Sequence, residues 1–163
     1  MTAEGLEEKV ADLLRSAEHT IAVAESCTGG LICHRLTNVS GSSEYLEMGV
    51  VAYSNRAKMN LLGVPEVVIA DHGAVSEACV RAMASGIREL AGTHIGLAVS
   101  GIAGPTGGTH EKPVGTVYVG LAGTKGEAGR HFSFSGSRLD IKEQSATEAL
   151  RMVSRYFEGE GPG

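Results

Sequence analysis

The stretch of sequence that decides the fold is HTIAVAESCTGGLICHRLTNV, residues 19–39. Residues 19–24 are mostly apolar or β-branched, and they predict a short buried strand. Residues 25–30 are mainly polar or glycine, and the apolar segment 31–39 that follows them predicts a helix. A strand that passes through a glycine-containing turn into a helix is typical of α/β folds, so this stretch favours that fold class.

The rest of the chain continues to alternate helices with strands. Helices are predicted over 4–17, from an N-cap at Ser54 to 62, over 77–91 and over 138–157. Strands are predicted over 44–53, 94–100, 114–122 and 129–135, the last two forming a hairpin around a Gly-Thr-Lys-Gly turn. We therefore expect an α/β fold, a three-layer α/β/α sandwich with a mixed β-sheet.

Length and composition point to an ordinary globular protein. The chain has 163 residues, 42% of them hydrophobic, and the expectation is one domain over 1–163 with a flexible tail at 158–163. The longest uncharged stretch, 95–109, contains five glycines and a proline, and no signal peptide is visible. We expect a cytoplasmic protein that does not bind membranes.

Charge and metal-ligand spacing exclude two further classes. The formal net charge of −5 argues against binding of nucleic acid through a basic surface. The six histidines are scattered, and the three cysteines form no CxxC pair, so no metal site is expected. An odd number of cysteines also fits a reduced compartment better than a disulfide scaffold.

Two glycine-rich loops are the candidate ligand-binding segments. Residues 25–30 and 101–108 each follow a predicted apolar strand. In open α/β sheets, ligands bind beyond the carboxyl ends of the strands. We therefore expect these two loops to face one another over a single cleft.

Ser26 is the first candidate for chemistry. A hydroxyl between a strand and a helix that begins with Thr-Gly-Gly suits a nucleophile beside an oxyanion hole made of backbone N–H groups. It also suits anion binding, or a plain cap in which Ser26 and Thr28 bond the first turn of the helix. Residue spacing alone favours the cap.

Lys58 is the second candidate. It lies in Tyr53-Ser-Asn-Arg-Ala-Lys58, early in a predicted helix that follows a strand. A lysine in a desolvated pocket loses its proton readily and is then able to act as a general base for a serine. The alternative is an ordinary surface charge, which spacing alone favours.

Other side chains compete for these roles. Cys27 is a rival nucleophile, but strand alternation puts it and Ser26 on opposite sides, so only one of them faces the cleft. His72 is a candidate base beside Asp71, or a turn residue ahead of an N-cap at Ser76. Lys112 and Arg138 are the cations best placed to meet a phosphate, unless they are solvated surface residues.

Six blocks of sequence resemble one protein family. They are AESCTGG (24–30), AYSNRAK (52–58), HGAVSE (72–77), SGIAGPTGG (100–108), KPVGTVYVG (112–120) and GSR (136–138). In this order and at this spacing, they resemble the CinA C-terminal family. The resemblance implies nicotinamide-nucleotide amidase activity, which converts nicotinamide mononucleotide to nicotinic acid mononucleotide and ammonia in pyridine-nucleotide recycling. It covers none of the N-terminal molybdopterin-binding-like domain of longer members, so no pyrophosphatase activity is expected.

The resemblance also implies roles for individual residues. It makes Ser26 the nucleophile, Lys58 the base and Tyr53 an orienting or proton-relay hydroxyl. It assigns oxyanion and substrate binding to Thr28, Gly29, Gly30, Ser100, Gly101, Ala103, Gly104, Gly107, Gly108 and Arg138. The implied partner is a small nucleotide substrate, with no cofactor or metal, in a homo-oligomer such as a dimer.

Two alternatives stay open at this point. One is a non-catalytic module that binds nucleotides or takes part in competence or damage responses. The other is a different amidase or esterase that uses Cys27 as its nucleophile.

Overall fold

One mixed sheet forms the centre of the protein in the computed structural model, which describes residues 5–159. Within that range the strand order is β2-β1-β3-β4-β5, in which β1 pairs in parallel with β2 and β3, whereas β4 and β5 are antiparallel. The strands are β1 Ile21–Glu25, β2 Leu46–Val51, β3 Ile95–Gly101, β4 Thr116–Gly123 and β5 Gly126–Ser133.

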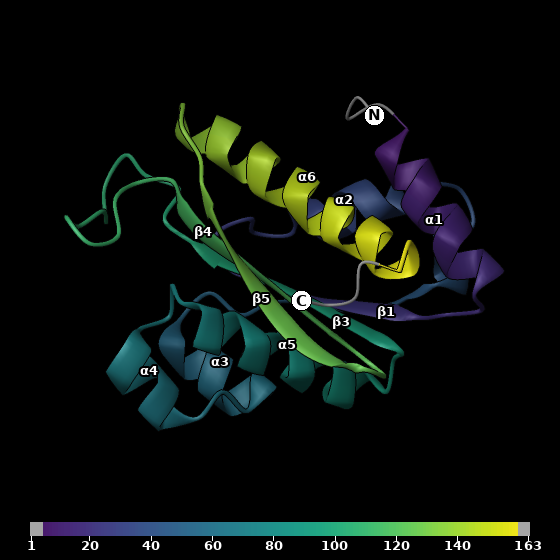
Figure 1. Ribbon diagram of the computed structural model, residues 1–163, viewed down its shortest axis with the longest axis horizontal. Helices are drawn as coiled ribbons and strands as arrows, with labels where there is room; N and C mark the ends of the chain where they lie inside the picture. The colour runs from purple at the N-terminus through teal and green to yellow at the C-terminus, as the bar shows by residue number, and fades with distance from the viewer. Residues whose placement is uncertain (1–4, 160–163) are drawn as a thin grey trace.

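Helices cover both faces of this sheet (Figure 1). On one face lie α1 Leu6–Ser16, α2 Leu31–Thr37 and α6 Arg138–Phe157, and on the other lie α3 Asn55–Leu62, α4 Glu66–His72 and α5 Glu77–Ala91. The arrangement confirms the predicted three-layer α/β/α sandwich with a mixed sheet.

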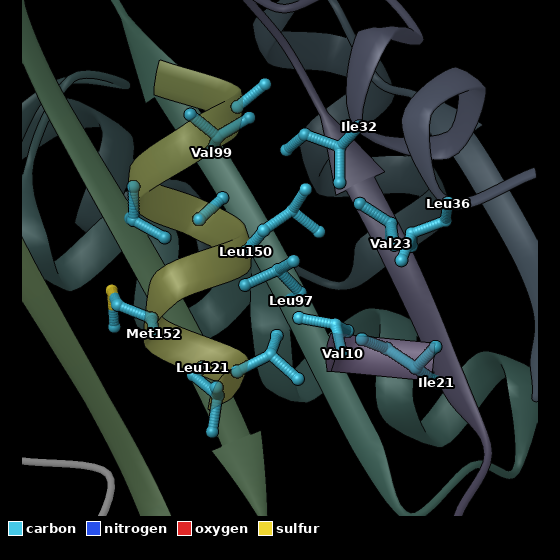
Figure 2. Packing of buried hydrophobic residues seen from close by; sticks show 14 of the residues in the cluster. Val10, Ile21, Val23, Ile32, Leu36, Leu97, Val99, Leu121, Leu150 and Met152 are labelled. Atoms are coloured by element: carbon cyan, nitrogen blue, oxygen red, sulfur yellow. The ribbon is translucent and has the colours of Figure 1, made fainter. Parts of the chain in front are cut away.

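Side chains of β1 alternate between two apolar cores. Ile21 and Val23 pack with α1, α2 and α6 in the core that Figure 2 shows, where Val10, Ile32 and Leu150 also lie. Ala22 and Ala24 face the other core, under α3 and α5. Because successive residues of a strand point to opposite faces, one continuous apolar strand serves both layers.

Helix α5 packs unusually close to the sheet because glycine lies beneath it. A Cβ added at Gly96 would lie 2.1 Å from the carbonyl oxygen of Ala84, and one at Gly120 would lie 2.3 Å from that of Val80. No side chain fits in either space. Part of the high glycine content is therefore explained by helix-to-sheet packing.

Two short elements differ from the sequence prediction. Helix α4 was not predicted, because its apolar EVVIA segment is too short to show helical periodicity. The 3-10 turn Ser42–Glu44 was also missed. Strand β5 begins at Gly126, three residues before the predicted start. Glu4 of the first predicted helix and residues 160–163 of the predicted tail lie outside the described residues.

The topology places several chain segments at one edge of the sheet. The parallel strands β1, β2 and β3 end there, and they are followed by Ser26, Ala52 and Ile102. Strand β5 is antiparallel to β4 and therefore runs in the same direction as β3, so it also ends at this edge. The chain then enters α6 at Arg138. The two glycine-rich loops therefore lie at the same edge, which is where the candidate site is found.

No helix in the described range is long and apolar enough to cross a membrane.

Gly86→Ala tests the close packing of α5 against α3. The added Cβ would lie 1.8 Å from the carbonyl oxygen of Leu62, the last residue of α3. Overpacking typically costs about 1–3 kcal/mol, and alanine recovers about 1 kcal/mol through its helix propensity. Because the clash is with backbone, we expect a net loss of about 1–2 kcal/mol in the free energy of unfolding, measured in urea. The control Glu89→Ala, an exposed position of the same helix, should change it by less than about 0.5 kcal/mol.

Candidate active site

Ser26 and Lys58 lie in direct contact at the carboxyl end of β1. The Lys58 Nζ donates a hydrogen bond to the Ser26 Oγ at 3.0 Å and another to the Tyr53 carbonyl oxygen at 2.9 Å. Lys58 is 2% exposed and Ser26 is 7% exposed. The lysine is therefore not a surface charge, and the two side chains that sequence analysis singled out separately form a pair.

Helix α3 holds Lys58 in this position. The Ser54 Oγ accepts a hydrogen bond from the Ala57 N–H and fixes the start of the helix directly after β2, as the sequence predicted. Lys58 follows one turn from this cap. The far end of α3 packs on α5 through Leu62, so the helix cannot shift away from the sheet without opening the core.

Burial lowers the pKa of Lys58 from its usual value, while the nearby Cys79 and Cys27 thiols act in the opposite direction. Among the described residues, no carboxylate forms an ion pair with Lys58; its hydrogen bonds go to a hydroxyl and a carbonyl. Neither group compensates a full positive charge, so the neutral amine is more accessible here than in a solvated lysine. A neutral amine beside a serine hydroxyl is able to accept its proton.

Glu25 is the functional residue that sequence reasoning missed. Its carboxylate is fully buried and accepts hydrogen bonds from the Ile32 N–H at 2.9 Å and the Cys33 N–H at 3.1 Å. It therefore caps the first turn of α2, and neither Ser26 nor Thr28 does so. An acidic residue shortly before a helix is the signal that was available, since carboxylates are stabilised at helix N-termini.

Because Glu25 caps the helix, the Ser26 hydroxyl is left for Lys58. The loop between Ser26 and α2 is held by two hydrogen bonds, both at 3.1 Å. One runs from the Gly29 N–H to the Ser26 carbonyl, and the other from the Leu31 N–H to the Thr28 carbonyl. In the described part of the chain, the N–H groups of Cys27, Thr28 and Gly30 donate to no other residue. These three amides, and not that of Gly29, are the unpaired backbone donors of the loop.

Thr28 carries a second unsatisfied group. Its side chain is 1% exposed, and its Oγ1 has no hydrogen-bond partner within residues 5–159. Buried hydroxyls are normally paired, so the unpaired Oγ1 of Thr28, two residues after Ser26, is an exception to the usual pattern.

Arg138 joins two other parts of the site. Its guanidinium donates to the Gly104 carbonyl at 2.7 Å and to the Tyr53 hydroxyl at 3.3 Å. Tyr53 therefore presents its carbonyl to Lys58 and its hydroxyl to Arg138, and its side chain is 59% exposed. The arginine connects the loop after β3 to the segment after β2. A single cleft between loops 25–30 and 101–108 stays a prediction.

The end of β3 and the loop that follows it approach the site unevenly. Ser100 and Ala103 are buried, Gly101 is half-buried, and Gly104 reaches Arg138. Gly107 and Gly108 are exposed, and a Cβ on Gly108 would lie 2.7 Å from the Val114 nitrogen. The far part of the loop therefore folds back on the segment before β4, and no hydrogen bond joins these glycines to Ser26 or Lys58 in the described chain.

The rival candidates lie elsewhere. Cys27 is 6% exposed and packs in the apolar core, and burial raises the pKa of its thiol to about 12. His72 lies at the exposed end of α4, where its carbonyl accepts a hydrogen bond from Lys112 at 2.7 Å. A cavity of about 870 Å³ adjoins these last two residues, between α4, α5 and β4, but Ser26 and Lys58 do not line it. No cluster of three or more potential metal ligands occurs in residues 5–159.

Comparison with known proteins identifies relatives over almost the whole chain. The family model described as the CinA C-terminal domain matches residues 3–157. A CinA-like protein of Syntrophus aciditrophicus is 54% identical over 155 residues, which cover 94% of this chain and 37% of that protein. A putative competence-damage inducible protein of Caldicellulosiruptor bescii is 51% identical over 150 residues, or 92% of this chain and 36% of that one. The chain thus spans little more than a third of the length of these curated relatives.

A solved structure extends the similarity to three dimensions. The competence damage-inducible protein A of Klebsiella pneumoniae superposes with a TM-score of 0.93 at 35% identity. The match covers 98% of this chain and 99% of that one. The same three-layer arrangement therefore occurs in a protein of nearly equal length.

Glu25→Gln tests the buried cap of α2. A glutamine offers one acceptor oxygen and places an NH₂ group against a backbone N–H, so one of the two bonds is lost in a buried site. We expect the free energy of unfolding to fall by about 1–3 kcal/mol, measured by urea denaturation. Glu8→Gln, at an exposed position of α1, is the matched control and should change the free energy of unfolding by less than about 0.5 kcal/mol. Equal stability of the two variants would contradict the role assigned to Glu25.

Proposed function

The chain belongs to the CinA C-terminal domain family, and from this premise we propose that it is an amidase that hydrolyses the carboxamide of nicotinamide mononucleotide. The products are nicotinic acid mononucleotide and ammonia. The observation that carries the proposal is the 3.0 Å hydrogen bond between the Ser26 hydroxyl and the amine of Lys58. This amine is buried, and no carboxylate in the described chain forms an ion pair with it. This pair is the nucleophile and base that amide hydrolysis needs.

In the first step, neutral Lys58 accepts the Ser26 proton while the Oγ attacks the carboxamide carbon. The resulting C–O bond gives a tetrahedral intermediate whose oxyanion requires hydrogen-bond donors. The unpaired N–H groups of Cys27, Thr28 and Gly30 are the donors that this loop offers. Donors of this kind contribute about 3–4 kcal/mol of transition-state stabilisation in other hydrolases.

In the second step, the C–N bond breaks and the Lys58 ammonium returns its proton to the departing nitrogen, which leaves as ammonia. Ser26 is then esterified by the acyl group. Water attacks this ester with Lys58 again as the base, and the carboxylate product is released with the Ser26 hydroxyl restored. Lys58 is able both to accept and to donate the proton in this scheme. Of its two hydrogen-bond partners, only the Ser26 hydroxyl carries a proton, because the Tyr53 carbonyl acts only as an acceptor.

The substrate itself supports this assignment. The positively charged pyridinium withdraws electrons from the carboxamide carbon and eases attack by a hydroxyl. The positive ring also attracts the oxyanion that forms on the carboxamide oxygen.

The burial of Cys27 argues against the thiol alternative. With its pKa raised to about 12, the thiol stays protonated near neutral pH, and its side chain packs on the core side of the loop. The serine therefore remains the nucleophile that faces Lys58.

Substitution of the pair is the direct test. We expect wild type to release ammonia from nicotinamide mononucleotide, and Ser26→Ala and Lys58→Met each to reduce kcat by at least about a hundredfold. Ser16→Ala and Lys125→Met, which are exposed and distant from the site, are the matched controls and should keep wild-type rates. Circular dichroism checks that each variant is folded.

Two results would contradict the proposal. A folded wild type that binds the nucleotide without releasing ammonia would instead support a non-catalytic binding module. Loss of activity in Cys27→Ala, with Ser26→Ala still active, would point to the thiol.

The pH dependence of kcat/KM gives a separate prediction. Only neutral Lys58 accepts a proton, so activity should rise with pH and level off above the Lys58 pKa in the folded protein. Burial places that pKa below 10.5, so the plateau should begin below the pH expected for a solvated lysine. A rate that falls as pH rises across this range would contradict the role of Lys58 as a base.

A further inference from the structure

Lys142 is a cation that the site contains and that the sequence analysis did not single out. It lies in the second turn of α6, is half-buried, and extends over the loop that carries Ser26. Its Nζ would lie 3.8 Å from a Cβ added at Gly29. Its charge also acts on the neighbouring Cys27 thiol, whose pKa it lowers against the larger effect of burial.

The charge of Lys142 has no partner in the described part of the protein. No hydrogen bond or ion pair joins its Nζ to any group within residues 5–159. The carboxylates beside it on α6 are occupied: Asp140 accepts hydrogen bonds from Ser137 in the helix cap, and Glu143 pairs with Arg35 at 3.7 Å. Lys142 is therefore a free positive charge held at the site by its own helix.

The other basic side chains considered above already donate hydrogen bonds to protein acceptors. Lys58 contacts Ser26 and the Tyr53 carbonyl, Arg138 donates to the Gly104 carbonyl and the Tyr53 hydroxyl, and Lys112 donates to the His72 carbonyl. Each of these side chains thus donates to at least one protein acceptor, whereas at Lys142 an anion would meet an ammonium with all three donors available.

Gly29 places no side chain against this ammonium. Its backbone is left-handed, with φ of +60°, a conformation that side chains rarely adopt. Lys142 approaches the loop that holds Ser26 from the helical layer opposite to α3 and Lys58. Carboxamide chemistry and anion binding thus have separate lysines, one from each helical layer.

We propose that Lys142 binds the phosphate of the substrate and thereby makes the site selective for a mononucleotide over the corresponding nucleoside. The proposal rests on the proposed function for the identity of the reacting carboxamide. The phosphate is the only anionic group of nicotinamide mononucleotide, and placing it at Lys142 directs the ring toward Ser26. Arg138 donates hydrogen bonds to Gly104 and Tyr53. In this proposal it positions those two segments and is not the main phosphate ligand.

The test compares two substrates that differ only in the phosphate. Ammonia release is measured from nicotinamide mononucleotide and from nicotinamide riboside, for wild type and for Lys142→Gln. We expect wild type to prefer the mononucleotide, and the ratio of the two kcat/KM values to fall about ten- to a hundredfold in Lys142→Gln, because a charge-assisted contact is lost. Lys142→Arg should restore most of the ratio.

Lys125→Gln is the matched control, since this exposed lysine lies in the β4–β5 hairpin at the far end of the sheet. Its substrate ratio should equal that of wild type. If Lys142 only supported the structure, its substitution would reduce activity on both substrates equally and the ratio would not move. An unchanged ratio in Lys142→Gln would overturn the proposal while leaving the amidase assignment intact.

Calorimetric binding of both compounds separates this proposal from the proposed function. If wild type releases no ammonia from either compound, the amidase assignment fails, and tighter binding of the mononucleotide that is lost in Lys142→Gln still supports the phosphate site. If wild type binds the two compounds equally, or binds neither, Lys142 is not a phosphate ligand.

Discussion

The contact between a buried amine and a serine hydroxyl is the constraint around which the rest of the structure is arranged. An ammonium that is 2% exposed and has no carboxylate partner is costly to bury, so burial lowers the pKa of Lys58. Such a lysine needs a rigid support, and the Ser54 cap and the packing of Leu62 on α5 supply it. The absence of side chains at Gly86, Gly96 and Gly120 is what lets α3, α5 and the sheet approach closely enough.

The two helical layers contribute different chemistry to one edge of the sheet. The layer with α3 and α5 presents Lys58, and the layer with α6 presents Arg138 and Lys142. Ser26 lies between them because it follows β1, the strand whose neighbours β2 and β3 are both parallel to it. Parallel strands end at a common edge of the sheet, and side chains from both helical layers reach the loop that follows β1 at this edge.

Glu25 separates the structural and the chemical tasks of the loop. A carboxylate satisfies two N–H groups of α2, which leaves the serine beside it without a capping duty. The same chain reversal leaves the amides of Cys27, Thr28 and Gly30 without an acceptor in another described residue. Some polar groups of this short segment therefore stabilise the start of α2, and others remain available for a reaction.

Local pattern determined most of the architecture. The apolar run at 19–24, the helical stripes of 77–91 and 138–157, and the turn near 124 depend on residues close together in the chain, so the three layers and the hairpin were predictable. The family was likewise recognisable from six ordered blocks. Helix α4 escaped prediction because seven residues carry too little periodicity to identify a helix.

Only the tertiary structure decided which polar groups meet. Spacing favoured a capping role for Ser26 and a surface position for Lys58, and both are overturned by contacts across 32 residues of sequence. Lys142 gave no local signal, since its significance comes from Gly29, more than a hundred residues earlier. Periodicity reports which face of an element is apolar, whereas burial, pKa shifts and charge pairing depend on distances between elements, which the order of residues along the chain does not contain.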